Sequence, residues 1–280
     1  MKSKIITFFT LLLISAAATV SAQQQSGVSV ESLRSDLAMY VCKNDERLGS
    51  VKALFKKLGA GDENITIEKF GDIENLTVTK KGKTAETIIV GAHYDKVRAG
   101  CGVIDNWTGI VIIANLYAAI KNVDTAKTYI FTAFGSEETG LKGSHAMAGS
   151  ISREDRPRYC SMINFDSFGF NYPQVLTNVS SPTMSKFAED LAKEINMPFA
   201  EASLAGAASA DSASFVASDI PAITFHGLTN NWQNYLHSSK DKIENVKVES
   251  VFVGYNFAYL FISRVDGGAC EMFRKVSHKN

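Results

Sequence analysis

Two histidines and five acidic residues stand in short segments that follow predicted strands. In chain order they are His93, Asp95, Asp105, Glu137, Glu138, Asp166 and His237. Imidazole and carboxylate groups are ligands of catalytic zinc, and paired zinc ions in such sites lie roughly 3.5–4 Å apart. The set predicts a pair of zinc ions, in which one carboxylate bridges and each metal takes one histidine and one further carboxylate. Cobalt or manganese could replace zinc with the same ligands.

Each of these residues alone has a commoner explanation. A lone histidine is more often a surface or hydrogen-bonded core residue than a ligand. An aspartate before a helix is usually an N-cap, and a Glu-Glu pair is usually solvated charge. Their grouping carries the prediction, because functional groups of open α/β sheets gather in loops beyond the carboxyl ends of the strands.

Apolar runs and helical periodicity predict the elements that position these residues. Strands are predicted at residues 65–70, 76–79, 87–90, 128–134, 160–165 and 222–225. Helices are predicted at residues 28–40, 47–58, 107–121, 141–152, 182–195 and 246–264. Strands that alternate with helices of this length indicate an α/β fold. We expect a three-layer α-β-α sandwich with a mixed, largely parallel central sheet, and with the first two strands antiparallel at one edge.

Residues 1–22 have the pattern of a secretory signal peptide. Lys2 and Lys4 precede an apolar run over positions 5–14, and small residues end at Ala22. The apolar run is too short to span a bilayer comfortably. We therefore expect export to the periplasm or the medium, with cleavage after Ala22 and no membrane attachment afterwards. Residues 23–280 are expected to form a single catalytic domain, because no linker or repeat divides them.

Charge and cysteine content narrow the classes of partner and metal site. The 280 residues include 29 basic and 29 acidic ones, without a block of like charge, which argues against nucleic acid or anionic membranes as partners. Cys42, Cys101, Cys160 and Cys270 form no CxxC pair, which argues against a thiolate zinc site. In an exported protein they can oxidise, and the sequence does not distinguish between the three possible pairings.

The same segments resemble the two-zinc aminopeptidase family, typified by secreted bacterial leucyl aminopeptidases and related to glutamate carboxypeptidase II. The family pattern H-x-D is present at residues 93–95, G-x-x-D-N-x-x-G at 102–109 and E-E-x-G-L-x-G-S at 137–144. I-N-x-D is present at 163–166 and H-x-x-x-D at 237–241. Every ligand position of the family therefore holds the expected type of residue.

The resemblance implies a ligand set and a cofactor. One zinc ion would be held by His93 and Asp166, and a second by Glu138 and His237. Asp105 would bridge the two. The implied cofactor is two zinc ions per chain, and the implied substrates are peptides with a free N-terminus.

The resemblance also implies roles for residues beside the ligands. Asp95 would accept a hydrogen bond from the far nitrogen of His93, which orients the imidazole. Glu137 would act as the general base, since its side chain points the opposite way from that of the next residue in an extended segment. Family members have a cis peptide after the bridging aspartate, so we expect one between Asp105 and Asn106.

Two positions depart from the family pattern. Many members carry tyrosine directly before the last ligand, whereas here Leu236 holds that place and Tyr235 precedes it. Tyr235 is therefore a candidate for contact with the oxyanion, and Asp211, in place of the family's S-D-H segment, is a candidate positioning residue. Residues near the ligand loops that could line a substrate pocket are Ser167, Phe168, Phe215, Phe225, Trp232 and Tyr235. Most of the aromatic residues among them are better explained as members of the hydrophobic core.

Three other functions fit parts of the pattern. A glutaminyl cyclase has a related fold with one zinc site, but the presence of both His93 and the Glu137-Glu138 pair in this sequence favours two metals. A carboxypeptidase or dipeptidase would need a cation for the C-terminal carboxylate, which Arg98 or Lys142 could supply. A binding protein without catalysis would usually have lost ligands, and none is lost here. We expect a preference for apolar N-terminal side chains, but the sequence predicts neither the particular residue nor the oligomeric state.

Overall fold

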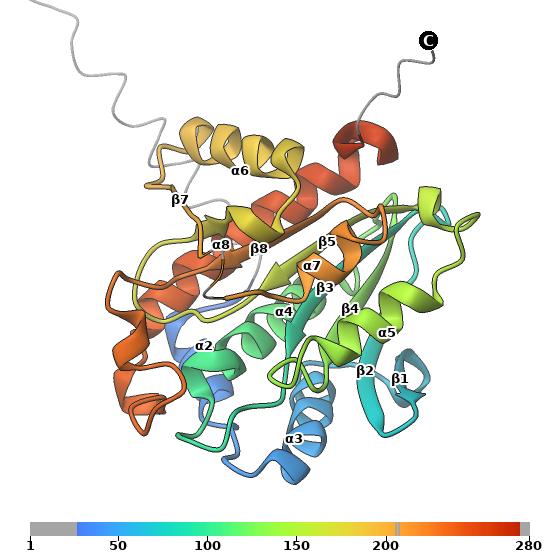
Figure 1. The fold of residues 1–280 in the computed structure, drawn as a ribbon. Coiled ribbons are helices and arrows are strands. Elements are labelled where there is room, and N and C mark those ends of the chain that lie inside the picture. Colours follow the sequence, from blue (N-terminus) through green and yellow to red (C-terminus); the bar gives the residue numbers. More distant parts are fainter. Residues whose placement is uncertain (1–26, 205, 207, 275–280) are drawn as a thin grey trace, which may run out of the picture.

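The computed structural model describes residues 27–204, 206 and 208–274 (Figure 1), so the predicted signal peptide lies outside the described residues. The α-helices are α2 (Val30–Leu37), α3 (Asn44–Lys57), α4 (Thr108–Ile120), α5 (Lys142–Ser150), α6 (Pro182–Glu194), α7 (Ser212–Val216) and α8 (Val248–Gly267). The strands are β1 (Ile65–Phe70), β2 (Ile73–Lys80), β3 (Thr87–His93), β4 (Thr128–Phe134), β5 (Tyr159–Phe165), β6 (Gln174–Leu176), β7 (Ala200–Ala202) and β8 (Ala222–His226).

The strands form one mixed sheet in the order β1-β2-β4-β3-β5-β8-β6-β7. At its centre β4, β3, β5 and β8 run parallel, whereas β1 and β2 form an antiparallel hairpin and β2 runs antiparallel to β4. At the other edge β6 runs antiparallel to β8, and β7 pairs parallel with β6. The predicted fold class and the antiparallel edge are confirmed. The short elements β6, β7 and α7 are additions that the sequence patterns did not predict.

Helices cover both faces of the sheet, as Figure 1 shows. The larger buried cluster includes Val90 of β3 and Phe257 of α8, and packs α2, α3, α4, α6 and α8 against one face. The smaller cluster includes Ile89, Met147 and Phe215, which places α5 and α7 on the opposite face. Ile89 and Val90 are neighbours in β3, so the strand presents apolar side chains to both layers. A strand covered on both faces is a continuous apolar run, which is why β3 was predictable from sequence.

The helix α4 and the turn before it are apolar enough to cross a membrane by length and composition. The stretch runs from Val103 to Ile120, and 89% of it is buried inside the protein. Other helices of the same layer, including α2, α3 and α8, pack against α4. This stretch is therefore the central core helix, with the turn that carries Asp105 at its start.

Two disulfides select one of the three pairings that the sequence left open. Cys42 is bonded to Cys101, and Cys160 to Cys270. The first joins the segment before α3 to the loop before α4, and the second joins β5 to the turn after α8. The first disulfide therefore ties the amino-terminal helices to the loop that carries Asp105.

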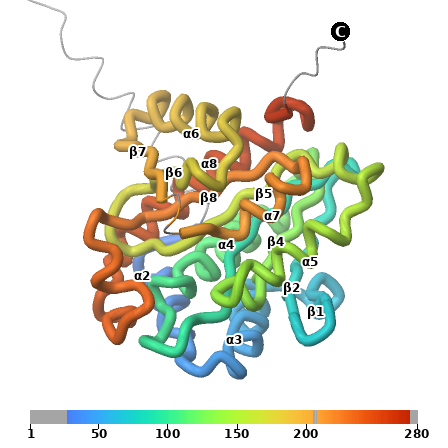
Figure 2. The backbone as a smooth tube through the Cα atoms, in the orientation of Figure 1, coloured from blue at the N-terminus to red at the C-terminus, as the bar shows by residue number. Residues whose placement is uncertain are grey.

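The segments with predicted ligands converge at the carboxyl edge of the central strands. Figure 2 shows the segment that follows β8 beside the segment that precedes α4. The backbone N–H of Cys101 donates to the carbonyl of Asp241 at 2.8 Å, which joins these two segments directly. Loops far apart in the sequence thus form one rim.

Candidate metal centre

Asp105 lies between the two predicted histidine ligands. Its Oδ1 is 3.1 Å from Nε2 of His93, and its Oδ2 is 3.3 Å from Nε2 of His237. Oδ1 of Asp166 is 3.6 Å from Nε2 of His93, and Oε2 of Glu138 is 3.0 Å from Nε2 of His237. The five predicted ligands form two groups that share Asp105, and the candidate donor atoms of each group lie within 4.8 Å of one another.

The chemistry of this donor set fits divalent cations. Against the effect of burial, Glu137 and Asp105 raise the pKa of His93 well above its ordinary value. Hydrogen bonds to Asp105 and Glu138 raise the pKa of His237 to about 10. Oε1 of Glu138 is buried and has no hydrogen-bond partner among the described residues. Imidazoles among buried carboxylates, one with an unpaired oxygen, are suitable ligands for zinc.

Asp95 supports the centre through both its backbone and its side chain. Its carbonyl oxygen is 3.1 Å from Nδ1 of His93, whereas its nearest carboxylate oxygen is 3.7 Å away. The carboxylate accepts hydrogen bonds from the backbone N–H groups of Glu137 at 2.9 Å and Glu138 at 3.2 Å. The prediction that the carboxylate orients His93 therefore needs refinement. The carbonyl is the nearer acceptor, because the carboxylate faces two amide donors of the Glu-Glu segment.

The loop that carries Asp105 is held to its neighbours by buried polar groups. The peptide bond between Asp105 and Asn106 is cis, as predicted. The N–H of Ile104 donates to Oδ1 of Asp241 at 2.7 Å. The N–H of Ser167 donates to Oδ1 of Asn106 at 3.1 Å. These bonds fix the shared carboxylate relative to the end of β5 and to the loop after β8.

Three non-glycine residues at or beside predicted site residues have a left-handed backbone. Their φ angles are 59° at Ser136, 61° at Ser167 and 56° at His237. Such residues are uncommon, cost of order 1–3 kcal/mol when strained, and cluster at functional sites. Ser136 precedes Glu137 and Ser167 follows Asp166, so these turns lie where the chain leaves β4 and β5.

Arg47 of α3 supports the centre from the core, and no sequence pattern identified it. The side chain is fully buried. Its Nη1 donates to the carbonyl of Cys101 and its Nη2 to that of Gly102, both at 2.9 Å, and its Nε donates to the carbonyl of Tyr94. Burial lowers the pKa of Arg47 to about 10, while nearby carboxylates, Asp241 first, oppose this. The guanidinium therefore joins the segment after β3 to the loop before α4.

A cavity of about 320 Å³ opens onto both ligand groups. Its apolar lining consists of Leu141, Leu176, Leu204, Leu228, Trp232 and Leu236, together with Ala208. Of the candidate pocket residues, Ser167 and Trp232 line the cavity. Phe168, Phe215 and Phe225 are fully buried core residues. The cavity lining thus combines clustered carboxylates with leucines.

Other candidate residues lie outside this arrangement. The Tyr235 ring has its centroid 4.8 Å from that of Phe170, and Tyr235 does not line the cavity. Asp211 belongs to neither ligand group, and its burial raises its pKa to about 7. Arg98 and Lys142 are exposed, and no lysine or arginine is among the described residues that line the cavity. The geometry therefore adds no support for a cationic pocket.

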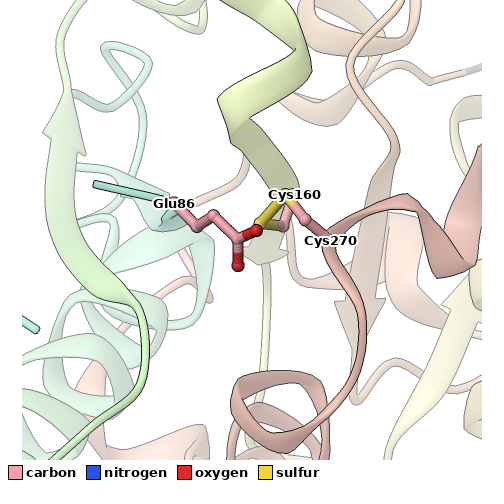
Figure 3. Close-up of side chains that lie close together, drawn as sticks. All are labelled: Glu86, Cys160 and Cys270. Atoms are coloured by element: carbon pink, nitrogen blue, oxygen red, sulfur yellow. A yellow bond between two sulfur atoms is a disulfide. The ribbon is translucent and has the colours of Figure 1, made fainter. Parts of the chain in front are cut away.

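Glu86 lies beside the disulfide between Cys160 and Cys270 (Figure 3). By distance alone these three residues form a further candidate metal group. Both sulfurs are in the S–S bond, however, so neither is a thiolate, the form in which cysteine binds metal. We therefore assign no metal to this group.

Solved structures share the fold of this chain. The LapA aminopeptidase of Legionella pneumophila superposes with a TM-score of 0.76 at 18% identity, covering 96% of this chain and 81% of that chain. The glutaminyl cyclase of an Acidobacteriales bacterium superposes with a TM-score of 0.69 at 13% identity, covering 95% and 99%. At these identities the likeness establishes the fold, and the activity has to be argued from the site.

Sequence comparison places the chain in a family. The pattern of Peptidase family M28 matches residues 75–253, which is more than half of the chain. The chain belongs to Peptidase family M28, in agreement with the predicted resemblance. The "Probable leucine aminopeptidase 2" of Trichophyton verrucosum is 30% identical over 124 residues, which are 42% of this chain and 25% of that protein. The chain thus spans about a quarter of the length of this curated relative.

Proposed function

We propose that the protein is a zinc-dependent aminopeptidase that binds two zinc ions and hydrolyses the N-terminal bond of peptides. The observation that carries this proposal is the position of Asp105. Each of its two oxygens faces a different histidine, and each histidine has a second carboxylate beside it. A carboxylate shared in this way is the arrangement expected of a ligand that bridges two metals.

His93 and Asp166 would hold one zinc ion, and Glu138 and His237 the other, with Asp105 shared. When bound, zinc lowers the pKa of water and polarises the carbonyl of the substrate. The protein must then supply the proton transfers and hold the substrate in place.

Glu137 is the residue suited to move the proton. It lines the cavity beside both ligand groups and belongs to neither. Burial raises its pKa above the ordinary value. The charge of His93 opposes this rise, and the carboxylates of Asp211 and Asp166 add to it. A carboxylate with raised proton affinity can take a proton from the attacking water and pass it to the departing amine. The hydrogen bond from its backbone N–H to Asp95 keeps this segment in position.

The charge around the cavity favours the amino end of a peptide. Four carboxylates line the cavity, and the described lining residues include neither lysine nor arginine. A C-terminal carboxylate would find no lysine or arginine partner there, which a carboxypeptidase or dipeptidase would need. Curated relatives named as leucine aminopeptidases support the same choice.

The place of action that we propose is outside the cytoplasm, in the periplasm or the medium. The pattern of residues 1–22 supports export. The two disulfides give independent support, because such bonds persist mainly in oxidising compartments.

The test is a panel of aminoacyl-p-nitroanilides, offered to the mature protein before and after chelation and again with zinc added back. We expect cleavage that the chelator abolishes and zinc restores. The N-acetylated forms of the same substrates should remain intact, because the free α-amine is required. Elemental analysis of the active protein should give two zinc ions per chain.

Two results would count against the proposal. Protein that holds two zinc ions and cleaves nothing in the panel is not an aminopeptidase. Release of ammonia from peptides with N-terminal glutamine, without cleavage of any peptide bond, would indicate a glutaminyl cyclase instead.

A further inference from the structure

His226 ends β8 on the same face of the sheet as the metal centre. The pairing of β5 with β8 places Phe165 opposite Phe225, and these two rings stack in the larger core cluster. Because side chains alternate along a strand, Asp166 and His226, one residue further along, share the opposite face. His226 accordingly lines the same cavity as His93 and Asp166.

The position of the proton on His226 follows from its backbone neighbour. The N–H of Leu228 donates to Nδ1 of His226 at 3.2 Å. Nδ1 therefore carries the lone pair, and in the neutral ring the proton resides on Nε2. Burial lowers the pKa of His226 to about 4, which agrees with a neutral ring. Nε2–H is then an uncharged hydrogen-bond donor.

This donor has no partner within the described structure. Nε2 of His226 is buried and makes no hydrogen bond, and the residue as a whole is only 5% exposed. The nearby hydroxyl of Thr224 is already paired, with Oγ of Ser212 at 2.6 Å and Nδ2 of Asn164 at 3.3 Å. Much of the remaining lining of the cavity is leucine. A buried donor in such surroundings is unfavourable unless water or a ligand supplies an acceptor.

We propose that Nε2–H of His226 selects N-terminal residues with a side-chain amide, asparagine or glutamine. This inference rests on the proposed aminopeptidase function. An amide oxygen is an uncharged acceptor and matches a neutral donor. An acidic side chain would bring a charge to an uncharged donor, in a cavity whose described lining residues include neither lysine nor arginine to pair with it. Ser209 lines the same cavity, and a serine hydroxyl is able to accept an N–H of the amide.

The test compares pairs of ligands that have the same shape. Asparagine is matched with leucine, and glutamine with 2-amino-5-methylhexanoic acid. Binding of the four free amino acids to the zinc-loaded protein is measured by calorimetry, and kcat/KM is measured for their p-nitroanilides. We expect the wild type to favour the amide of at least one pair about 10- to 100-fold, because the hydrocarbon leaves the donor unpaired.

Two substitutions separate the donor from the volume of the ring. His226→Phe should abolish the preference within the pair, and His226→Gln, which keeps an N–H donor, should restore part of it. Trp232→Phe is the matched control. It changes the apolar wall of the cavity and should shift both members of each pair equally.

The outcomes distinguish this inference from the function on which it rests. Equal binding of amide and hydrocarbon by the wild type would overturn it. An equal loss of affinity for all four ligands in His226→Phe would also overturn it, because His226 would then contact the backbone of the substrate and not its side chain. A binding preference that His226→Phe removes, in protein that cleaves no anilide, would leave the inference standing and the aminopeptidase proposal rejected.

Discussion

The two ligand groups differ in how the protein holds them. In the first, the side chains of His93 and Asp166 are 1% and 15% exposed, and both residues stand at the ends of central strands. In the second, Glu138 is 7% exposed but His237 is 57% exposed, in the long loop between β8 and α8. Asp105, which is 8% exposed, belongs to both.

This difference indicates a division between a fixed and an adjustable position. Core strands open at a free energy close to that of global unfolding, whereas exposed loops open locally at much lower free energy. The sheet therefore fixes the first group, and the loop that carries His237 completes the second. We expect a metal at the second position to exchange faster.

Removal of the shared carboxylate should abolish the difference between the two metal positions, because both positions lose a ligand. We expect Asp105→Ala to lose both zinc ions and to reduce kcat/KM about a thousandfold or more, since the metals supply several kcal/mol of transition-state stabilisation. Elemental analysis and anilide hydrolysis measure the two effects. Asp62→Ala, which removes an exposed carboxylate paired with Lys56, should change neither.

Glu137→Gln should separate chemistry from metal binding. Loss of the proposed base is expected to lower kcat about 10²- to 10⁴-fold while both zinc ions stay bound. Glu138→Gln, one residue away, should instead lose the zinc ion of the second group. Loss of zinc from Glu137→Gln would show that this residue is a ligand, and the assignment of roles would have to be exchanged.

Release of zinc to a chromogenic chelator should occur in two phases, which sharpens the contrast directly. We expect the second position to empty at least about tenfold faster, because its histidine is exposed and lies on a loop. His237→Ala should hold one zinc ion and show the slow phase alone, and His93→Ala should show the fast phase alone. Release in a single phase from the wild type would contradict the division into fixed and adjustable positions.

Asp95→Ala should have a smaller effect than the loss of a ligand, and it should increase the contrast between the positions. Its carboxylate orients the Glu137–Glu138 segment, so we expect zinc affinity to fall about 10- to 100-fold. The backbone carbonyl beside His93 remains in this variant, and the first position should be affected less than the second. Asp95→Asn keeps one acceptor oxygen and should recover part of the affinity, as measured by competition with a zinc indicator.

The elements that could be predicted are those with a strong pattern of their own. The bounds of β1 and β4 agree with prediction, because each is an apolar or alternating run between turn residues. The strands β6 and β7 have three residues each, and α7 has five. These elements form because of tertiary pairing, such as that of Gln174 with His226, which no local window contains.

The same distinction applies to the site. The predicted ligands stand in short motifs, and the structure brings all five together around Asp105. Arg47 and His226 were not predicted, because each is a single polar residue in an otherwise ordinary element. Their importance depends on what surrounds them. For Arg47 this is three carbonyls from distant segments, and for His226 it is a nitrogen left without a partner.

Because the ligands are spread along the chain, the amount of bound metal measures how much of the protein is intact and folded. The first group draws on residues 93–166 and the second on residues 105–237, so only a chain in which β3, β4, β5 and β8 are assembled contains both. Zinc that binds only the native state stabilises it by RT ln(1 + [L]/Kd), about 1.4 kcal/mol for each tenfold rise in free zinc above Kd. The melting temperature should therefore rise with free zinc. The zinc content of a preparation would then report the fraction of molecules that are intact and fully folded.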